Sequence, residues 1–259
     1  MNCILLPACT SLCDSQGKVI HPIQSLSAHK KCITAAQAVI TDIDQVTHIT
    51  HVLKSQVGDT LKIGQLQGNL GTGVITKIDA SSVHLANICL TKLPPAKLDL
   101  TLILALPRPK VLRRLIMDMT AIGVKQIVLL NSVRSQKSYW QSPLLKRIDE
   151  FLIEGLQQGV DTIPPTILLR QRFKPFVEDE LPAWIKNKTA VIAHPQASQS
   201  FTQLIKEQGK PQLICVGAEG GWVDYEVALL QAQGVLTASL GERILRTEAA
   251  VNVLCGQII

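Results

Sequence analysis

The chain has 259 residues, of which 46% are hydrophobic, so it is long enough to bury a sizeable core in one or two domains. No run approaches the roughly 18 apolar residues of a membrane span, and the N-terminus lacks the basic and long apolar regions of a secretory signal. We therefore expect a cytoplasmic protein without a membrane partner, and the net charge of +6 favours a polyanionic partner.

The seven cysteines are scattered, at positions 3, 9, 13, 32, 89, 215 and 255. None forms a Cys-x-x-Cys pair, and the single Cys9-x3-Cys13 spacing has no second pair to complete a zinc site. We expect free, mostly structural thiols in a reducing compartment and no bound metal.

The first 95 residues have the pattern of short strands. Near-alternation of apolar and polar residues occurs over three runs, namely 60–66, 73–78 and 82–88. The glycines at 68, 71 and 73 lie between two of these runs, which indicates a turn and not a phosphate-binding loop. This part of the sequence predicts a small antiparallel barrel or sandwich.

Pro94-Pro95 favours an extended connector, so we predict two domains, 1–95 and 96–259. After the connector, continuous apolar runs of buried strands alternate with segments of helical periodicity. The predicted strands are 100–106, 126–130, 166–169, 189–194, 212–217 and 235–240, and the predicted helices are 109–122, 143–157, 200–208, 224–233 and one from about 245. Alternation of this kind predicts an α/β domain with a parallel sheet covered by helices.

Basic residues are concentrated between positions 108 and 147. This segment has nine lysines and arginines, at 108, 110, 113, 114, 125, 134, 137, 146 and 147, against the single carboxylate of Asp118. One interpretation of this bias is a solvated helix face, and the alternative is a face that binds phosphates. Because the bias is local and of one sign, it favours a face that binds phosphates.

Three predicted strands end in segments typical of ligand sites: 193–195, 217–221 and 239–243. Ligands of open parallel sheets bind at the carboxyl ends of the strands, where glycines allow close approach of the backbone. Their convergence predicts a pocket of backbone amides and carbonyls that suits adenine-like edges. Each segment also has a purely structural interpretation, including Asp224 as the N-cap of the following helix and His194 as a structural histidine.

Four charged residues crowd the start of the apolar last helix: Glu242, Arg243, Arg246 and Glu248. Buried charges are costly unless each has a partner. These residues therefore either cap a surface helix or line a pocket in which a ligand supplies the partners. Glu248 in the first helical turn suits the helix dipole, whereas Arg246 does not.

The stretch 216–250, VGAEGGWVDYEVALLQAQGVLTASLGERILRTEAA, resembles the signature of the RsmE family. Members of this family are SPOUT-class methyltransferases that modify N3 of a uridine in small-subunit ribosomal RNA. The resemblance extends to 48–61, 104–110, 120–130 and 133–140 and is weak over the first forty residues.

The resemblance implies a PUA-like RNA-binding domain followed by a catalytic domain tied in a trefoil knot. It implies a homodimer that uses S-adenosylmethionine to methylate 16S ribosomal RNA, in the assembled 30S subunit. We assign charge stabilisation on the uracil to Arg246 and proton acceptance to Glu248, held close to Arg246. The predicted cofactor-binding residues are His194, Gly217, Glu219, Gly220, Gly221, Leu240, Gly241, Ile244, Leu245 and Thr247, and the predicted RNA-binding residues are Arg108, Arg113, Arg114, Arg134 and Lys137.

The chain departs from the family pattern at four positions. Ala218 replaces a proline, Ala249 a threonine and Ala121 a common glutamate, and Val160 stands where the family usually has an arginine. The changes at 160 and 249 leave open a non-catalytic ribosome-binding module. A nicotinamide-dependent oxidoreductase would also fit the alternating pattern, but the chain lacks the G-x-G-x-x-G fingerprint.

Overall fold

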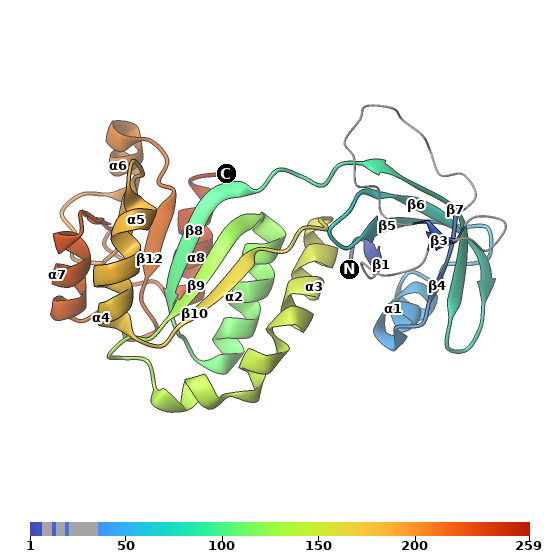
Figure 1. Ribbon diagram of the computed structural model, residues 1–259, viewed down its shortest axis with the longest axis horizontal. Helices are drawn as coiled ribbons and strands as arrows, with labels where there is room; N and C mark the ends of the chain where they lie inside the picture. Colours follow the sequence, from blue (N-terminus) through green and yellow to red (C-terminus); the bar gives the residue numbers. More distant parts are fainter. Residues whose placement is uncertain (7–11, 14–18, 21–35) are drawn as a thin grey trace. The chain divides into compact units, whose positions relative to one another are not determined.

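The computed structural model describes residues 1–6, 12–13, 19–20 and 36–259, and these form two compact units (Figure 1). The first unit comprises the described residues up to 96 together with 156–164, and the second comprises 97–155 and 165–259. The predictions for Cys9 and Cys32 fall outside the described residues. No helix in the described part is long and apolar enough to cross a membrane.

The first unit is a curled seven-stranded sheet with the order β1-β5-β6-β7-β4-β2-β3. The strands are β1 (Ile4–Leu6), β2 (Leu12–Cys13), β3 (Val19–Ile20), β4 (Ala36–Ile40), β5 (Thr60–Gln65), β6 (Leu70–Ile78) and β7 (Val83–Lys92). All pairs are antiparallel except β1 and β5, which run parallel. The prediction of an antiparallel barrel or sandwich is therefore wrong for the first strand, because β1 pairs parallel with β5.

A short helical segment covers part of this sheet. Asp42 caps α1 (Ile43–Thr47) by accepting a hydrogen bond from the Gln45 amide at 2.9 Å, and the chain continues as a π-helical turn over His48–Val52. Val46 and Ile49 of this segment are buried among residues of β1, β5 and β7.

The turn between β5 and β6 is shorter than the glycines at 68, 71 and 73 predict, since Gly71 lies inside β6. A Cβ there would come within 1.7 Å of the Cys89 carbonyl oxygen, so only glycine allows this approach.

Residues 156–164 group with the first unit, although the sequence places them in the second domain. The backbone amides of Asn2 and Cys3 donate to the Gln157 carbonyl at 3.0 and 3.2 Å. The Gln67 amide donates to the Thr162 carbonyl at 2.8 Å, and the Thr162 hydroxyl donates to the Gly68 carbonyl. These bonds tie a later segment of the chain to the N-terminal sheet, and no local sequence pattern indicates such long-range pairing.

The second unit is a six-stranded sheet with the order β10-β9-β8-β12-β11-β13, and every pair in it is parallel. The strands are β8 (Leu98–Ala105), β9 (Val124–Leu130), β10 (Thr166–Arg170), β11 (Ala190–Ala193), β12 (Leu213–Val216) and β13 (Leu236–Ala238). All six correspond to predicted strands. The continuous apolar runs form parallel strands because both of their faces are buried.

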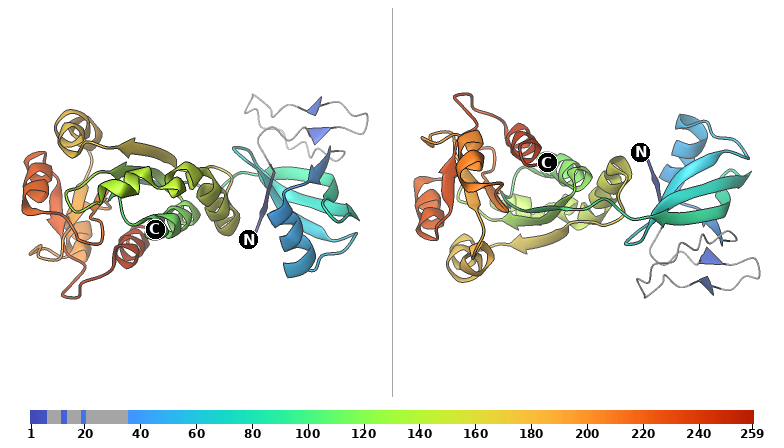
Figure 2. Two further views of the ribbon diagram at one scale, coloured as in Figure 1. Left: turned by 90° about the horizontal axis from the view of Figure 1, so that it is seen from below. Right: turned by 90° about the horizontal axis from the view of Figure 1, so that it is seen from above.

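Helices cover both faces of this sheet (Figures 1 and 2). The predicted helices are α2 (Pro109–Ile122), α3 (Ile148–Gly159), α6 (Phe201–Gln208), α7 (Asp224–Ala232) and α8 (Thr247–Gly256), and Gly123 ends α2 in a left-handed conformation. The sequence missed the helical stretch of α4 (Phe173–Pro175), a π-helical turn (Phe176–Glu180) and α5 (Leu181–Ile185). Two 3₁₀ turns, Lys137–Gln141 and Pro143–Arg147, precede α3.

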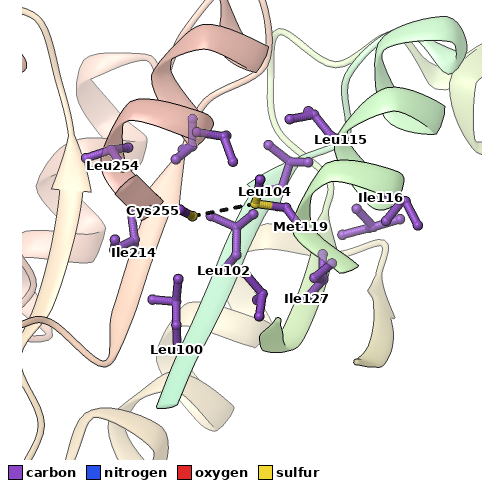
Figure 3. Packing of buried hydrophobic residues seen from close by; sticks show 14 of the residues in the cluster. Leu100, Leu102, Leu104, Leu115, Ile116, Met119, Ile127, Ile214, Leu254 and Cys255 are labelled. Atoms are coloured by element: carbon purple, nitrogen blue, oxygen red, sulfur yellow. Dashed lines mark hydrogen bonds between the residues drawn. The ribbon is translucent and has the colours of Figure 1, made fainter. Parts of the chain in front are cut away.

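Successive strand residues alternate between two cores. Leu102 and Leu104 of β8 pack with α2, α3, α6 and α8, whereas Ile103 and Ala105 face the core that contains α4, α5 and α7 residues. In the first of these cores the thiol of Cys255 on α8 lies 3.5 Å from the sulfur of Met119 on α2 (Figure 3). Dense apolar packing on both faces holds the strand ends in fixed positions.

Three of the cysteines, Cys3, Cys215 and Cys255, are buried free thiols, as expected. Burial raises the pKa of Cys3 to about 11, that of Cys255 to about 12 and that of Cys215 further, since the thiolate is the form that loses hydration. Cys89 is disulfide-bonded, so the expectation of free thiols is wrong at that position.

Candidate functional site

A cavity of about 280 Å³ opens at the carboxyl ends of β11, β12 and β13. The three strand ends that the sequence singled out therefore do converge. The cavity is lined by Ala193, His194, Pro195, Val216, Gly217, Ala218, Glu219, Gly220, Gly221, Leu240, Gly241, Arg243, Ile244, Leu245, Thr247 and Ala250. All ten residues predicted to surround a cofactor are among them.

The loop after β12, residues 217–223, folds back on itself. The Gly221 amide donates to the Ala218 carbonyl at 2.8 Å, and Gly221 has a positive φ of 72°. A Cβ on Gly217 would lie 2.8 Å from the Gly221 Cα, which is closer than real Cβ contacts. Glycines at both positions therefore allow the loop to close tightly and leave its backbone facing the cavity.

Backbone hydrogen bonds fix the other two strand ends. The His194 amide donates to the Ala238 carbonyl at 2.9 Å, which joins the end of β11 to β13. Ser239 receives a bond from the Phe201 amide at 2.8 Å and donates its own amide to the Gln199 carbonyl at 2.9 Å. His194 is half-buried, and its Nδ1 accepts the Gln196 amide at 3.3 Å. These bonds place the His194 ring at the cavity wall.

Three of the four charged residues at the start of α8, namely Glu242, Arg243 and Arg246, are exposed, so their charges are not buried against the apolar helix. Arg243 lines the cavity, whereas Arg246 and Glu248 are not among the lining residues. Among the described residues neither Arg246 nor Glu248 makes a side-chain hydrogen bond or ion pair, so the predicted Arg246–Glu248 contact is absent.

The reason for this difference is local geometry. Gly241 has a φ of 103°, which turns the loop so that Arg243, Ile244 and Leu245 face the cavity. Arg246 is the N-cap residue of α8 and makes no side-chain capping bond. The sequence pattern placed Arg243 among the four charged residues but assigned it no role in the site, and the signal that could have done so is Gly241, two residues earlier.

Three side chains connect the loop after β12 to neighbouring loops. Glu219 accepts the Arg108 amide at 3.1 Å, and the Arg134 guanidinium donates to the Gly220 carbonyl. Glu226, fully buried, accepts the Val133 amide at 2.8 Å and the Val223 amide at 3.0 Å. The prediction of Asp224 as N-cap of α7 is wrong by one position. Val223 is the cap residue, and the side-chain bond at this terminus comes from Glu226.

Of the predicted RNA-binding residues, Arg108 precedes α2, Arg113 and Arg114 lie in α2, and two more, Arg134 and Lys137, follow β9. Arg108, Arg113, Arg114, Arg134 and Lys137 are all exposed. Arg113 pairs with Glu154 at 2.9 Å and lies 5.6 Å from the centre of the Phe151 ring, so its charge is already partnered. Arg134 is bonded to the cavity loop. Arg108, which is bonded only through its backbone amide, Arg114 and Lys137 remain as cations without a side-chain partner among the described residues.

The composition of the cavity matches a nucleoside-like ligand with an apolar part and a charged part. Backbone amides and carbonyls of three loops can pair with adenine edges. A Cβ on Gly220 would meet the Arg134 side chain at 2.9 Å, so a larger residue at position 220 would displace Arg134. Val216, Leu240, Ile244 and Leu245 supply apolar walls. No group of three or more metal-ligating side chains occurs in the described ranges.

The parallel sheet, its two helical layers and the cavity at its carboxyl edge define an α/β protein of the class that binds ligands at strand ends. The chain belongs to the RNA methyltransferase family: the model described as RNA methyltransferase domain matches residues 94–259. The model described as RNA methyltransferase PUA domain matches residues 40–86.

Individual relatives agree with this assignment. Ribosomal RNA small subunit methyltransferase E of Treponema pallidum is 27% identical over 216 residues, which cover 82% of this chain and 81% of the relative. The enzyme of the same name from Mycobacterium tuberculosis is 24% identical over 235 residues and 87% of each chain. The crystal structure of this methyltransferase from Neisseria gonorrhoeae, bound to S-adenosyl methionine, shares the fold with a TM-score of 0.70 and 19% identity over 99% of this chain and 95% of that one. The predicted fold class is confirmed as far as an α/β domain with a parallel sheet covered by helices, preceded by a PUA-like domain.

Proposed function

We propose that this protein is an S-adenosylmethionine-dependent methyltransferase that methylates N3 of a uridine in 16S ribosomal RNA. The observation that carries the proposal is the cavity at the ends of β11, β12 and β13, in a chain of the RNA methyltransferase family. The relatives named small subunit methyltransferase E, and a neighbour crystallised with S-adenosyl methionine, support both the substrate class and the cofactor.

The residues at the cavity suit this cofactor. The glycine loop 217–221 and the turn at Gly241 would hold it through backbone groups, and Leu240, Ile244 and Leu245 would pack against its apolar faces. When bound, S-adenosylmethionine supplies an electrophilic methyl group on a sulfonium centre. Enclosure by three loops would orient that group and exclude water from it.

Uracil N3 is a weak nucleophile until it loses its proton, so the protein must favour the anionic base. We assign charge stabilisation at the uracil oxygens to Arg246 and acceptance of the N3 proton to Glu248. Both lie beside Thr247, which lines the cavity, and Arg246 is exposed and unpaired among the described residues. Arg243, unlike Arg246, lines the cavity and is a further cation that can contact the base or the cofactor carboxylate.

The RNA is proposed to contact the basic residues Arg108, Arg113, Arg114, Arg134 and Lys137 and the PUA-like domain of residues 1–95, with catalysis in residues 96–259. The relatives support 16S ribosomal RNA as the substrate. A trefoil knot around the cavity, a homodimer, the assembled 30S subunit as substrate and a cytoplasmic location complete the proposal on the basis of the family resemblance.

The test is transfer of labelled methyl from S-adenosylmethionine to 30S subunits that lack the modification. We expect label at uridine N3 with the unaltered protein. With Arg246→Ala we expect a loss of about 100-fold or more in rate, as for removal of a charge-stabilising donor, and unchanged cofactor binding. Arg172→Ala, an exposed arginine on another loop, serves as the control and should retain the rate.

Two outcomes would contradict the proposal. Cofactor binding without transfer to 30S subunits or to free 16S RNA would favour the alternative of a non-catalytic ribosome-binding module, which the departures at Val160 and Ala249 leave open. Absence of cofactor binding would remove the enzyme assignment altogether.

A further inference from the structure

Glu226 is a fully buried acidic residue that has no part in the proposed chemistry. It lies in the first turn of α7 and does not line the cavity. Its carboxylate joins two separate loops, since Oε1 accepts the Val133 amide at 2.8 Å and Oε2 accepts the Val223 amide at 3.0 Å. A buried carboxylate is tolerated only when such donors replace its hydration.

Glu226 connects the loop after β12, which lines the cavity, with the loop after β9. Val223 ends the loop after β12, whose glycines line the cavity. Val133 belongs to the loop after β9, next to Arg134, whose guanidinium donates to the Gly220 carbonyl. The cavity loop is therefore attached to the loop after β9 at two points, one through Glu226 and one through Arg134.

The loop after β9 is itself firmly anchored. The buried Ser135 hydroxyl donates to the Leu106 carbonyl at 2.8 Å and lies 3.0 Å from the Ser132 hydroxyl. The Asn131 side chain accepts a bond from the Trp140 indole at 2.8 Å. These bonds restrain the loop after β9. Because Glu226 links the two loops, they also restrain the loop 217–223.

From this network we infer that Glu226 is a positioning residue: it holds the loop 217–223 in the conformation that binds the cofactor, and does so without touching the cofactor. The inference rests on the proposed function for the identity of the ligand, but the link between the loops stands on the hydrogen bonds alone. Loss of the link would let the cavity loop sample other conformations, and binding would then be reduced by the fraction of competent molecules.

The test compares Glu226→Gln with Leu230→Val. The introduced amide has the shape of the carboxylate but only one acceptor atom, so one of the two backbone amides loses its partner. Leu230 is fully buried in the same helix and contacts the apolar core, so its truncation destabilises α7 without altering either loop bond. Cofactor affinity is measured by calorimetry well below the melting temperature of both variants.

For Glu226→Gln we expect the dissociation constant and the KM for S-adenosylmethionine to rise about tenfold, while kcat at saturating cofactor stays within about twofold. For Leu230→Val we expect a lower melting temperature and an affinity within about twofold of the unaltered protein. Equal affinity of Glu226→Gln and the unaltered protein would overturn the inference, as would an equal loss in both variants.

A second measurement needs no variant. The amide protons of Val133 and Val223 lie in loops, and Val133 is 70% exposed, yet both should exchange slowly with deuterium because Glu226 accepts them. Exchange as fast as that of neighbouring loop amides would overturn the inference even if Glu226→Gln did not fold. Slow exchange in a protein that does not bind S-adenosylmethionine would refute the proposed function and leave the loop connection in place.

Discussion

Val160 has a left-handed backbone conformation, with a φ of 54°, directly after α3. A β-branched side chain in this region is strained, since its branched carbon approaches the neighbouring backbone. The family resemblance places an arginine at this position, so the chain has here both an unusual residue and an unusual conformation. The conformation comes from the chain reversal after α3, where the Asp161 amide donates to the Leu156 carbonyl at 3.0 Å.

Replacement of Val160 by asparagine should therefore stabilise the fold. Asparagine adopts the left-handed region readily, and relief of the strain is worth about 1 kcal/mol in the free energy of unfolding. Urea unfolding followed by circular dichroism measures the change, with Val160→Ile as the control that keeps the branched side chain. A midpoint for Val160→Asn at or below that of Val160→Ile would show that strain at this residue is negligible.

Helix α8 packs its apolar face against α2 on one side of the parallel sheet, and Cys255 lies in this contact (Figure 3). The thiol has a pKa raised to about 12 by burial, from an ordinary value of 9.0. Below pH 9 both the folded and the unfolded chain keep the thiol protonated. As the pH rises toward 12 only the unfolded chain ionises, so stability contributed by the thiol is lost across that window.

The free energy of unfolding should accordingly fall above pH 9, and by less in Cys255→Val than in the unaltered chain. The limit for a single group is about 1.4 kcal/mol per pH unit. Urea unfolding at pH 8.5, 9.5 and 10.5 gives the comparison, and the valine variant removes the thiol while filling a similar volume. Parallel decreases in the two proteins would mean that Cys255 ionises equally in both states.

At the scale of the whole molecule, the proposed contact with RNA depends on the excess of basic residues between positions 108 and 147. Arg113 is paired with Glu154 and lies against Phe151, whereas Arg114 has no side-chain partner among the described residues. A cation that is already paired neutralises an RNA phosphate less fully than a free one, and fewer counterions are then released from the RNA. The single-signed segment that the sequence identifies therefore contains residues of unequal value for RNA binding.

We expect Arg114→Ala to weaken binding of a 16S RNA fragment and to reduce the slope of log affinity against log salt by about 0.7–0.9, the contribution of one phosphate contact. Arg113→Ala should change the slope less. Fluorescence anisotropy titrations between low and moderate KCl measure both slopes. Equal slopes for Arg114→Ala and the unaltered protein would exclude Arg114 from the RNA interface.

Much of the second unit was predictable from local patterns. Apolar runs such as 100–106 and 126–130 indicated the parallel strands because both faces of this sheet are buried. The glycines at 217, 220, 221 and 241 located the cavity, since Gly217 permits a close backbone approach and the turns at Gly221 and Gly241 have positive φ. The helical stretch 173–185 was missed since it is divided into three short pieces, and no single piece is long enough to repeat an apolar spacing of i, i+3, i+4 and i+7.

By itself, the sequence determined the alternation of strands and helices, the family resemblance and the three loops that surround the cavity, because each depends on residue type and spacing along the chain. Which charged side chains meet which partners depends on the folded arrangement of the chain. Arg243 faces the cavity while Arg246 does not, Arg113 is neutralised by Glu154, and Glu226 accepts the amide of a residue 93 positions earlier in the chain. These pairings depend on how distant segments come together, and a local pattern contains no record of that.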